Sequence, residues 1–181
     1  IAQDLSKDMR VVAADMPGRG LSDWLPDPAL YAVPTYVSAC VALVARLDPG
    51  TLDWLGTSMG GLIGMGYASL PNNPIRKLIL NDVGPSLNFA ALQRIGDYVG
   101  KPVRFQSLDE ARKYIRTISQ PFGPHTEAQW NALTDSVLLK KGEFWQPHYD
   151  PNIGQAFQNL SESTTLLHET ALWAAFDSIK A

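Results

Sequence analysis

The stretch LDWLGTSMGGLIGMG at residues 52–66 decides the fold. It begins as an apolar run, passes through the turn Gly-Thr-Ser-Met-Gly at residues 56–60, and continues as a glycine-rich apolar run. The short run at 51–55 predicts a buried strand, and the uncharged run at 59–70 predicts a helix buried on nearly every face. The stretch therefore predicts a strand that turns abruptly into a helix, with Ser58 at the apex.

The turn has the G-x-S-x-G pattern of a nucleophile elbow, in which a strained backbone exposes a serine hydroxyl above a sheet. We expect Gly56 and Gly60 to stand where a Cβ would collide across the turn. We expect Gly61 and Gly64 to let the helix pack close to neighbouring strands. This spacing of glycine and serine also arises by chance at an appreciable rate, so a turn without chemistry is the alternative at this point.

The flanking segments repeat the alternation of strand and helix. Residues 10–14 (RVVAA) and 76–80 (RKLIL) are predicted strands, and residues 35–47 have apolar side chains at helical spacing behind Thr35, a good N-cap. This order, with short polar joins, is typical of an α/β fold with a parallel, doubly wound sheet and helices on both faces. Residues 1–85 are therefore predicted to form part of an α/β core.

After residue 85 the pattern becomes helical. Four segments without a convincing strand between them have helical patterns: residues 87–99, 108–118, 127–139 and 170–176. We expect residues 86–176 to form a helical insertion over the sheet, and residues 177–181 to be a linker towards a further core strand. Because residues 1–8 resemble the tail of an amphipathic helix and the chain stops in this linker, we expect truncation at both ends.

The composition indicates a soluble globular chain. Its 181 residues are 18% charged with a formal net charge of −3, which gives no basis for nucleic-acid binding. No apolar run is long enough for a membrane helix. Cys40 is the single cysteine, which excludes an intrachain disulfide, and its apolar helical surroundings predict a buried, inert thiol. A lone cysteine is compatible with a reducing compartment, so we expect a cytoplasmic location.

The glycine-rich loops do not fit nucleotide binding. Two glycine pairs could begin a dinucleotide fingerprint, but the third glycine is replaced by Asp23 after Gly18 and Gly20, and by Ser69 after Gly64 and Gly66. A phosphate loop needs a lysine at the position of Leu62. We therefore expect no cofactor and no metal.

Three blocks within residues 10–85 resemble the α/β-hydrolase superfamily, in particular its lidded serine hydrolases, which include bacterial carboxylesterases and carbon–carbon hydrolases of aromatic catabolism. DMPGRGLS at 15–22 is similar to the loop after the family's fourth strand, and GTSMGG at 56–61 is similar to its elbow. LILNDVGP at 78–85 is similar to the end of its sixth strand, where a helical lid begins. The blocks stand in the family's order and spacing, which favours an elbow over a turn without chemistry.

The resemblance implies that Ser58 is a nucleophile attacking a carbonyl carbon and that the backbone N–H of Met59 is one donor to the oxyanion. It implies that the second oxyanion donor precedes residue 1 and that the acid and the histidine of a triad follow residue 181. Asp82 is an alternative acid, because some family members take their acid from this strand. The favoured interpretation of Asp82 is a structural residue that caps the following turn.

Other polar residues are expected to have supporting roles. Asp15, Arg19 and Ser22 are expected to brace the loop beside the elbow. The histidines all fall in the predicted insertion, where surface or lid positions are expected: His125, His148 and His168. His148 is the best candidate for a site role. Five aromatic residues are further candidates for lining a substrate pocket: Phe89, Phe122, Trp130, Phe144 and Trp145. For each of these five, ordinary helix packing is the alternative.

These residues favour a small-molecule substrate with an apolar acyl or aryl group, and no nucleic-acid or membrane partner. The leading hypothesis is a serine hydrolase that cleaves a small carboxylic ester, or a thioester, lactone or activated ketone, through Ser58. A carbon–carbon bond hydrolase or a thioesterase of the same fold is the alternative. Haloalkane dehalogenases and epoxide hydrolases resemble this chain but place Asp at the apex. A hypothesis of another class is a non-catalytic ligand-binding or interaction module, which the missing base motivates.

Overall fold

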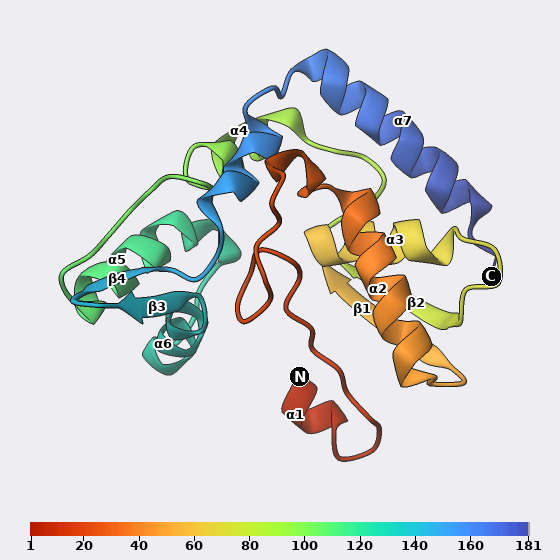
Figure 1. The fold of residues 1–181 in the computed structure, drawn as a ribbon, viewed down its shortest axis with the longest axis horizontal. Coiled ribbons are helices and arrows are strands. Elements are labelled where there is room, and N and C mark those ends of the chain that lie inside the picture. The colour runs from red at the N-terminus through yellow and green to blue at the C-terminus, as the bar shows by residue number, and fades with distance from the viewer. Residues whose placement is uncertain (181) are drawn as a thin grey trace.

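The structure is a computed structural model that describes residues 1–180 (Figure 1). The elements of the first half are α1 (Ala2–Leu5), the 3-10 helix η1 (Pro28–Leu30), α2 (Val33–Leu47), β1 (Leu52–Thr57), α3 (Met59–Ala68) and β2 (Ile75–Asn81). Those of the second half are α4 (Phe89–Gly96), α5 (Leu108–Ile118), η2 (Gln120–Phe122), α6 (Glu127–Ser136), β3 (Leu138–Lys141), β4 (Phe144–Pro147), η3 (Pro151–Phe157) and α7 (Glu162–Ser178).

β1 and β2 form a parallel two-stranded sheet, and α3 connects them. α3 lies against the face that carries Trp54 and Leu78. A Cβ added at Gly64 would stand 2.5 Å from Trp54 Nε1 and 2.8 Å from Leu78 Cδ1, so the glycine lets the helix approach the sheet. The opposite face carries Leu55 and Ile79, which are 47% and 52% exposed. The predicted α/β class with its parallel sheet and helices is confirmed, and the described helices cover the Trp54 face more fully.

Residues 10–14 do not form the predicted strand. Among residues 1–180 no strand pairs with this segment, and Val12 is exposed. A strand needs a neighbour that supplies ladder hydrogen bonds, so an apolar, β-branched sequence is not sufficient by itself.

Two predicted helix ends also differ. α2 begins at Val33 rather than behind Thr35, because Pro34 occupies the first turn, where its missing N–H leaves no hydrogen bond unmade. At the other end of the chain, the predicted linker at 177–181 begins inside α7, which runs to Ser178. Ala181 lies outside the described residues. The division into a core at 1–85 and a lid at 86–176 stays a prediction.

The second half contains a β-hairpin where the sequence predicted helix and loop. β3 pairs antiparallel with β4, with Lys141 opposite Phe144, so Gly142 and Glu143 form the connection. Gly142 has φ 62°, as a two-residue hairpin turn requires at its first central position. The hairpin shortens the predicted helix at 127–139, and α6 ends at Ser136.

Buried apolar side chains gather in two clusters. The main core joins both halves of the chain and contains Tyr31, Tyr36, Val37, Cys40, Val44, Ile63, Tyr67 and Ile153. The second core contains Phe105, Ala111, Ile115 and Leu138. In Figure 1, α5, α6, β3 and β4 lie together, apart from β1 and β2, and we call these four elements the α5–β4 lobe. Cys40 is buried as expected. No helix formed by residues 1–180 combines the length and the apolar character needed to cross a membrane.

Candidate active site

Ser58 occupies the single residue between β1 and α3 and has φ 51° and ψ −120°. A positive φ in a residue other than glycine is uncommon and costs on the order of 1–3 kcal/mol, so it persists only where the surrounding structure holds it. Such strained residues cluster at functional sites. The side chain of Ser58 is exposed, so its hydroxyl is accessible to solvent.

The glycines around Ser58 have different roles. A Cβ at Gly56 would collide with the backbone of Gly60 and Gly61, which cannot move aside, so the predicted need for glycine at 56 is confirmed. A Cβ at Gly61 would collide with Val83 Cγ1, again as predicted. The predicted collision at Gly60 is wrong, because a Cβ there would point into open space.

The backbone N–H of Met59 is available to a ligand. It is the first N–H of α3, and no acceptor for it exists among residues 1–180. The first N–H groups of a helix have no intrahelical partner and lie at its electropositive end. A donor of this kind directly after Ser58 can stabilise negative charge that develops on an atom bound to the Ser58 oxygen.

Asp82 lies at the same edge of the sheet as Ser58, since it follows β2 as Ser58 follows β1. It has φ 54° and is exposed. Among the residues that the structure describes, its carboxylate accepts no hydrogen bond, so the predicted cap of the following turn is not formed. Among residues 1–180, no hydrogen bond joins Asp82 to Ser58 or to a histidine, and its role as an acid stays a prediction.

None of the histidines hydrogen-bonds to the Ser58 hydroxyl within the described chain. His125 Nδ1 lies 2.9 Å from the carbonyl oxygen of Gly123, and its ring packs against Trp130 with centroids 4.7 Å apart. His168 is exposed on α7. His148 is half-buried after β4, where its backbone is hydrogen-bonded on both sides. The described residues therefore supply no general base to Ser58.

The loop at 15–22 is braced by the three side chains predicted for that role. Asp15 Oδ2 accepts a hydrogen bond of 2.9 Å from Leu21 N, and Ser22 Oγ donates one of 2.7 Å to the Asp15 carbonyl oxygen. Arg19 Nη1 donates to the Tyr36 hydroxyl at 2.9 Å, and its guanidinium lies over the Tyr36 ring. The bonds of Asp15 and Ser22 brace the loop internally, and the contacts of Arg19 with Tyr36 hold it against α2.

The predicted pocket aromatics have separate positions in the structure. Trp130 is buried in α6 beneath the Arg116 guanidinium. Trp145 packs against the second core from β4, and Phe122 is exposed on η2. All three belong to the α5–β4 lobe or its connections, where they contribute to packing or surface.

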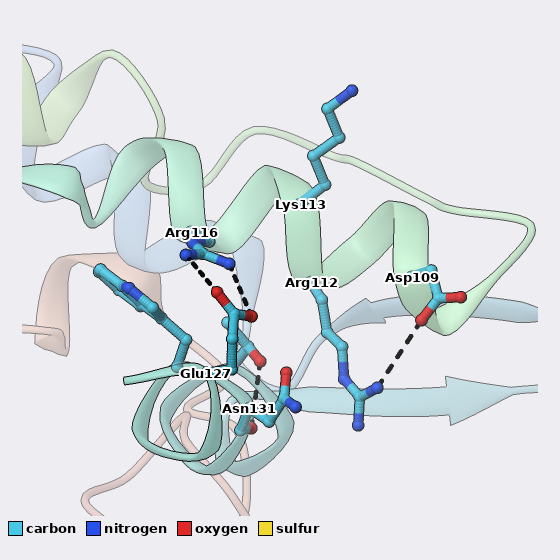
Figure 2. Close-up of a pocket in the computed structure, with 8 residues that line it drawn as sticks. Asp109, Arg112, Lys113, Arg116, Glu127 and Asn131 are labelled. Atoms are coloured by element: carbon cyan, nitrogen blue, oxygen red, sulfur yellow. Dashed lines mark hydrogen bonds and ion pairs between the residues drawn. The ribbon is translucent and has the colours of Figure 1, made fainter. Parts of the chain in front are cut away.

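A groove of about 350 Å³ opens between α5 and α6 (Figure 2). Two bidentate ion pairs join the two helices. Arg112 donates to the Asp135 carboxylate at 2.7 and 2.6 Å, and Arg116 donates to Glu127 at 3.0 and 2.7 Å. The neighbouring guanidinium lowers the pKa of each carboxyl from its usual value. The carboxylates of Asp135 and Glu127 are both paired with arginines, so they hold α5 and α6 together and neither is a base for Ser58. Nor do residues 1–180 contain a cluster of three or more His, Cys, Asp or Glu side chains that could hold a metal.

One buried polar pair was not predicted from the sequence. The Tyr31 hydroxyl donates to Asp150 Oδ2 at 2.5 Å. The two residues are 119 positions apart, and no spacing rule connects them.

The sequence model of the alpha/beta hydrolase fold family matches residues 1–162. The chain is 48% identical to a 3-hydroxybutyrate-oligomer hydrolase of Cupriavidus necator, over 99% of this chain and 63% of that protein. It thus spans less than two thirds of the length of this curated relative.

Solved structures agree with this match. A protein from Rickettsia typhi superposes with a TM-score of 0.80 and 36% identity, over 85% of this chain and 55% of that one. An alpha/beta hydrolase from Novosphingobium aromaticivorans superposes with a TM-score of 0.74 and 26% identity, over 90% of this chain and 57% of that one.

Proposed function

The chain belongs to the alpha/beta hydrolase fold family. We propose that Ser58 is the nucleophile of a serine hydrolase that cleaves small carboxylic esters. The observation that carries the proposal is the backbone of Ser58, which is held at φ 51° between a strand and a helix with its side chain exposed. The unpaired N–H of Met59 beside it supports the same reaction.

In this proposal the Ser58 oxygen forms a bond to the ester carbonyl carbon, and a base takes the hydroxyl proton. The carbonyl oxygen becomes negatively charged and accepts a hydrogen bond from Met59 N–H. The bond to the alcohol oxygen then breaks, the alcohol leaves with the proton, and an acyl group remains on Ser58. Water attacks this acyl-enzyme in the same way, which releases the carboxylic acid and restores the serine.

The proposal needs a base and an orienting acid, which the described residues do not join to Ser58. We assign both to the remainder of the full-length protein, since the chain spans 63% of the Cupriavidus relative. Asp82 is the alternative acid, because it lies at the same sheet edge as Ser58. If Asp82 is the acid, Asp82→Asn lowers kcat by about a thousandfold or more, whereas a turn residue leaves kcat nearly unchanged.

The relative's name suggests the first substrate to examine. Oligomers of 3-hydroxybutyrate are linear esters of a short hydroxy acid, and each internal linkage presents the carbonyl that Ser58 would attack. We propose this chemical class as substrate, with short acyl esters of other alcohols as model compounds. The sequence predicted an apolar acyl or aryl group on a small ester; this substrate class keeps the small ester but has a more polar acyl group.

The test is a fluorophosphonate probe applied to the full-length protein, with hydrolysis of p-nitrophenyl butyrate and of the 3-hydroxybutyrate trimer measured in parallel. We expect a phosphonate adduct at Ser58 and loss of both activities in Ser58→Ala, by about a thousandfold or more. Ser69→Ala is the matched control, because Ser69 lies just beyond the other end of α3 and its hydroxyl donates to the Gly66 carbonyl oxygen, one turn back in the same helix. Full activity in Ser58→Ala would refute the assignment.

A carbon–carbon bond hydrolase or a thioesterase would use the same nucleophile. Labelling of Ser58 without ester hydrolysis, but with turnover of an acyl-thioester or a vinylogous diketone, would select one of these. A non-catalytic ligand-binding or interaction module is the second candidate, favoured by the lack of a base hydrogen-bonded to Ser58 in the described residues. It predicts no labelling at Ser58 and no turnover of any of these substrates.

A further inference from the structure

Tyr31 and Asp150 form a buried polar contact between the two halves of the chain. They are 4% and 1% exposed. Asp150 Oδ2 accepts the Tyr31 hydroxyl at 2.5 Å, and Oδ1 accepts the backbone N–H of Asn152 at 2.9 Å. No ion pair among residues 1–180 includes Asp150, so neutral donors alone stabilise this buried carboxylate. A buried charge is costly without hydrogen bonds, so the position of Asp150 depends on Tyr31.

The proton stays on Tyr31. Burial raises the pKa of Tyr31, and the hydrogen bond to Asp150 raises it further. The hydroxyl therefore remains a donor to Asp150. It also accepts a hydrogen bond of 2.8 Å from Leu25 N, which fixes its orientation.

Backbone hydrogen bonds reinforce the same contact. Asp150 N donates to the Gly18 carbonyl oxygen at 2.7 Å, and Gly20 N donates to the His148 carbonyl oxygen at 3.0 Å. A Cβ at Gly18 would stand 2.5 Å from Tyr31 Cε1, so the Tyr31 ring lies directly against this loop. The chain that leaves β4 is thus attached by two backbone bonds to the loop at 15–22 and by one side-chain bond to Tyr31, which follows η1.

This attachment adjoins the turn at Ser58 through the main core. Tyr31 and Ile153 belong to that core, and both Met59 and Tyr149 pack against it. Met59 follows Ser58, and Tyr149 precedes Asp150. Figure 1 shows the segment before α2 running between the α5–β4 lobe and the sheet. A shift at Asp150 would therefore move the lobe relative to Ser58.

We propose that the Tyr31–Asp150 hydrogen bond is a positioning contact that fixes the α5–β4 lobe relative to Ser58 and so sets the binding of the substrate's acyl chain. The assignment rests on the proposed function of Ser58. Neither Tyr31 nor Asp150 takes part in bond making. Loss of the contact weakens the binding of acyl chains long enough to reach the lobe, whereas a short acyl group is bound by the turn alone.

The experiment compares Tyr31→Phe with the wild type in the full-length protein, using p-nitrophenyl acetate and p-nitrophenyl octanoate. We expect KM for the octanoate to rise about tenfold, while KM for the acetate and both kcat values change by less than about twofold. Tyr67→Phe is the control, because Tyr67 is a buried tyrosine of the same core that takes no part in this contact. It should leave both KM values unchanged.

Asp150→Asn has nearly the same shape as the wild type and should give the same split between the two esters. Equal changes in KM for both esters, or no change in either, would overturn the proposal. Failure of both variants to fold would also overturn it, because the pair would then serve stability alone. Fluorophosphonate labelling distinguishes failure of the nucleophile role of Ser58 from failure of the positioning role of Tyr31 and Asp150. Unlabelled wild-type protein refutes the role of Ser58, whereas labelling at the wild-type rate without the KM split refutes only the positioning role.

Discussion

The backbone N–H of Ser58 donates a hydrogen bond of 3.0 Å to the carbonyl oxygen of Asn81. Asn81 is the last residue of β2, and its side-chain Nδ2 donates to Thr57 Oγ1 at 3.1 Å. The turn that ends β1 is therefore attached to the neighbouring strand both at Ser58 and one residue before it. These bonds explain how Ser58 keeps a positive φ, because strained residues persist only where several contacts hold them.

Relief of this strain should raise stability while it removes activity. Ser58→Gly removes the steric penalty at φ 51°, and we expect a gain of about 1 kcal/mol in the free energy of unfolding relative to Ser58→Ala, after the entropy cost of glycine. Urea unfolding of both variants measures this difference, and neither should hydrolyse esters. The control is the same pair of variants at Ser38, which lies inside α2. There Ser38→Gly should be about 1 kcal/mol less stable than Ser38→Ala. A less stable Ser58→Gly would show that the turn is not strained.

The glycines on either side of Ser58 should respond in opposite ways to alanine. Gly56→Ala forces a methyl group into the backbone of Gly60 and Gly61, so we expect a loss of about 2 kcal/mol or more and loss of labelling at Ser58. Gly60→Ala points into open space and should leave stability within about 0.5 kcal/mol. Thermal unfolding and fluorophosphonate labelling measure both effects. Similar losses in the two variants would contradict the geometry of the turn.

The local features of the turn could be predicted because neighbouring residues determine them. Gly56 is required by contacts within the strand–turn–helix unit, which the sequence pattern reveals directly. Gly61 and Gly64 are required because the helix of this unit packs against β2 and against Val83, which follows β2. Gly60 occupies an equally conspicuous position in the motif, but the direction of its Cβ depends on backbone angles that a pattern does not contain.

Contacts between distant segments could not be predicted in the same way. Residues 10–14 have the composition of a strand, yet strand formation depends on a partner that the segment does not specify. Tyr31 and Asp150 meet only because the chain after β4 returns to the first loop. Trp130 and Trp145 are aromatic residues in a predicted lid, and only the structure reveals that they pack within the α5–β4 lobe.

The ion pair between Arg112 and Asp135 should make stability depend on pH. Arg112 lowers the pKa of Asp135 in the folded state below its ordinary value of 3.8. The unfolded chain binds the proton more readily, so the pair stabilises the fold above about pH 4, and this contribution is lost as the pH falls through the folded-state pKa. We expect Asp135→Asn to be less stable than the wild type at pH 7, and this difference to disappear as the pH falls below the folded-state pKa of Asp135, as measured by urea unfolding.

Asp109→Asn is the matched control for that prediction. Asp109 lies 3.7 Å from the same arginine, but it is 93% exposed and has only this one longer contact. Exposed pairs contribute little, so its removal should leave the pH dependence unchanged. If both variants behaved alike, the bidentate geometry of Arg112 with Asp135 would not be the source of the effect.

The hairpin that the sequence did not reveal should depend on Gly142. Its φ of 62° is unfavourable for any residue with a Cβ, although no atom within 4 Å would obstruct one. Gly142→Ala therefore measures the energetic cost of the positive φ alone. We expect a loss of about 1 kcal/mol, with faster amide exchange at Leu139 and Gln146, and a smaller loss for Gly142→Asn, which tolerates positive φ better. Gly84→Ala is the control, because Gly84 also has open space around it but no positive φ. An equal loss at Gly84 would mean that a general effect of replacing glycine, rather than the hairpin turn, determines the result.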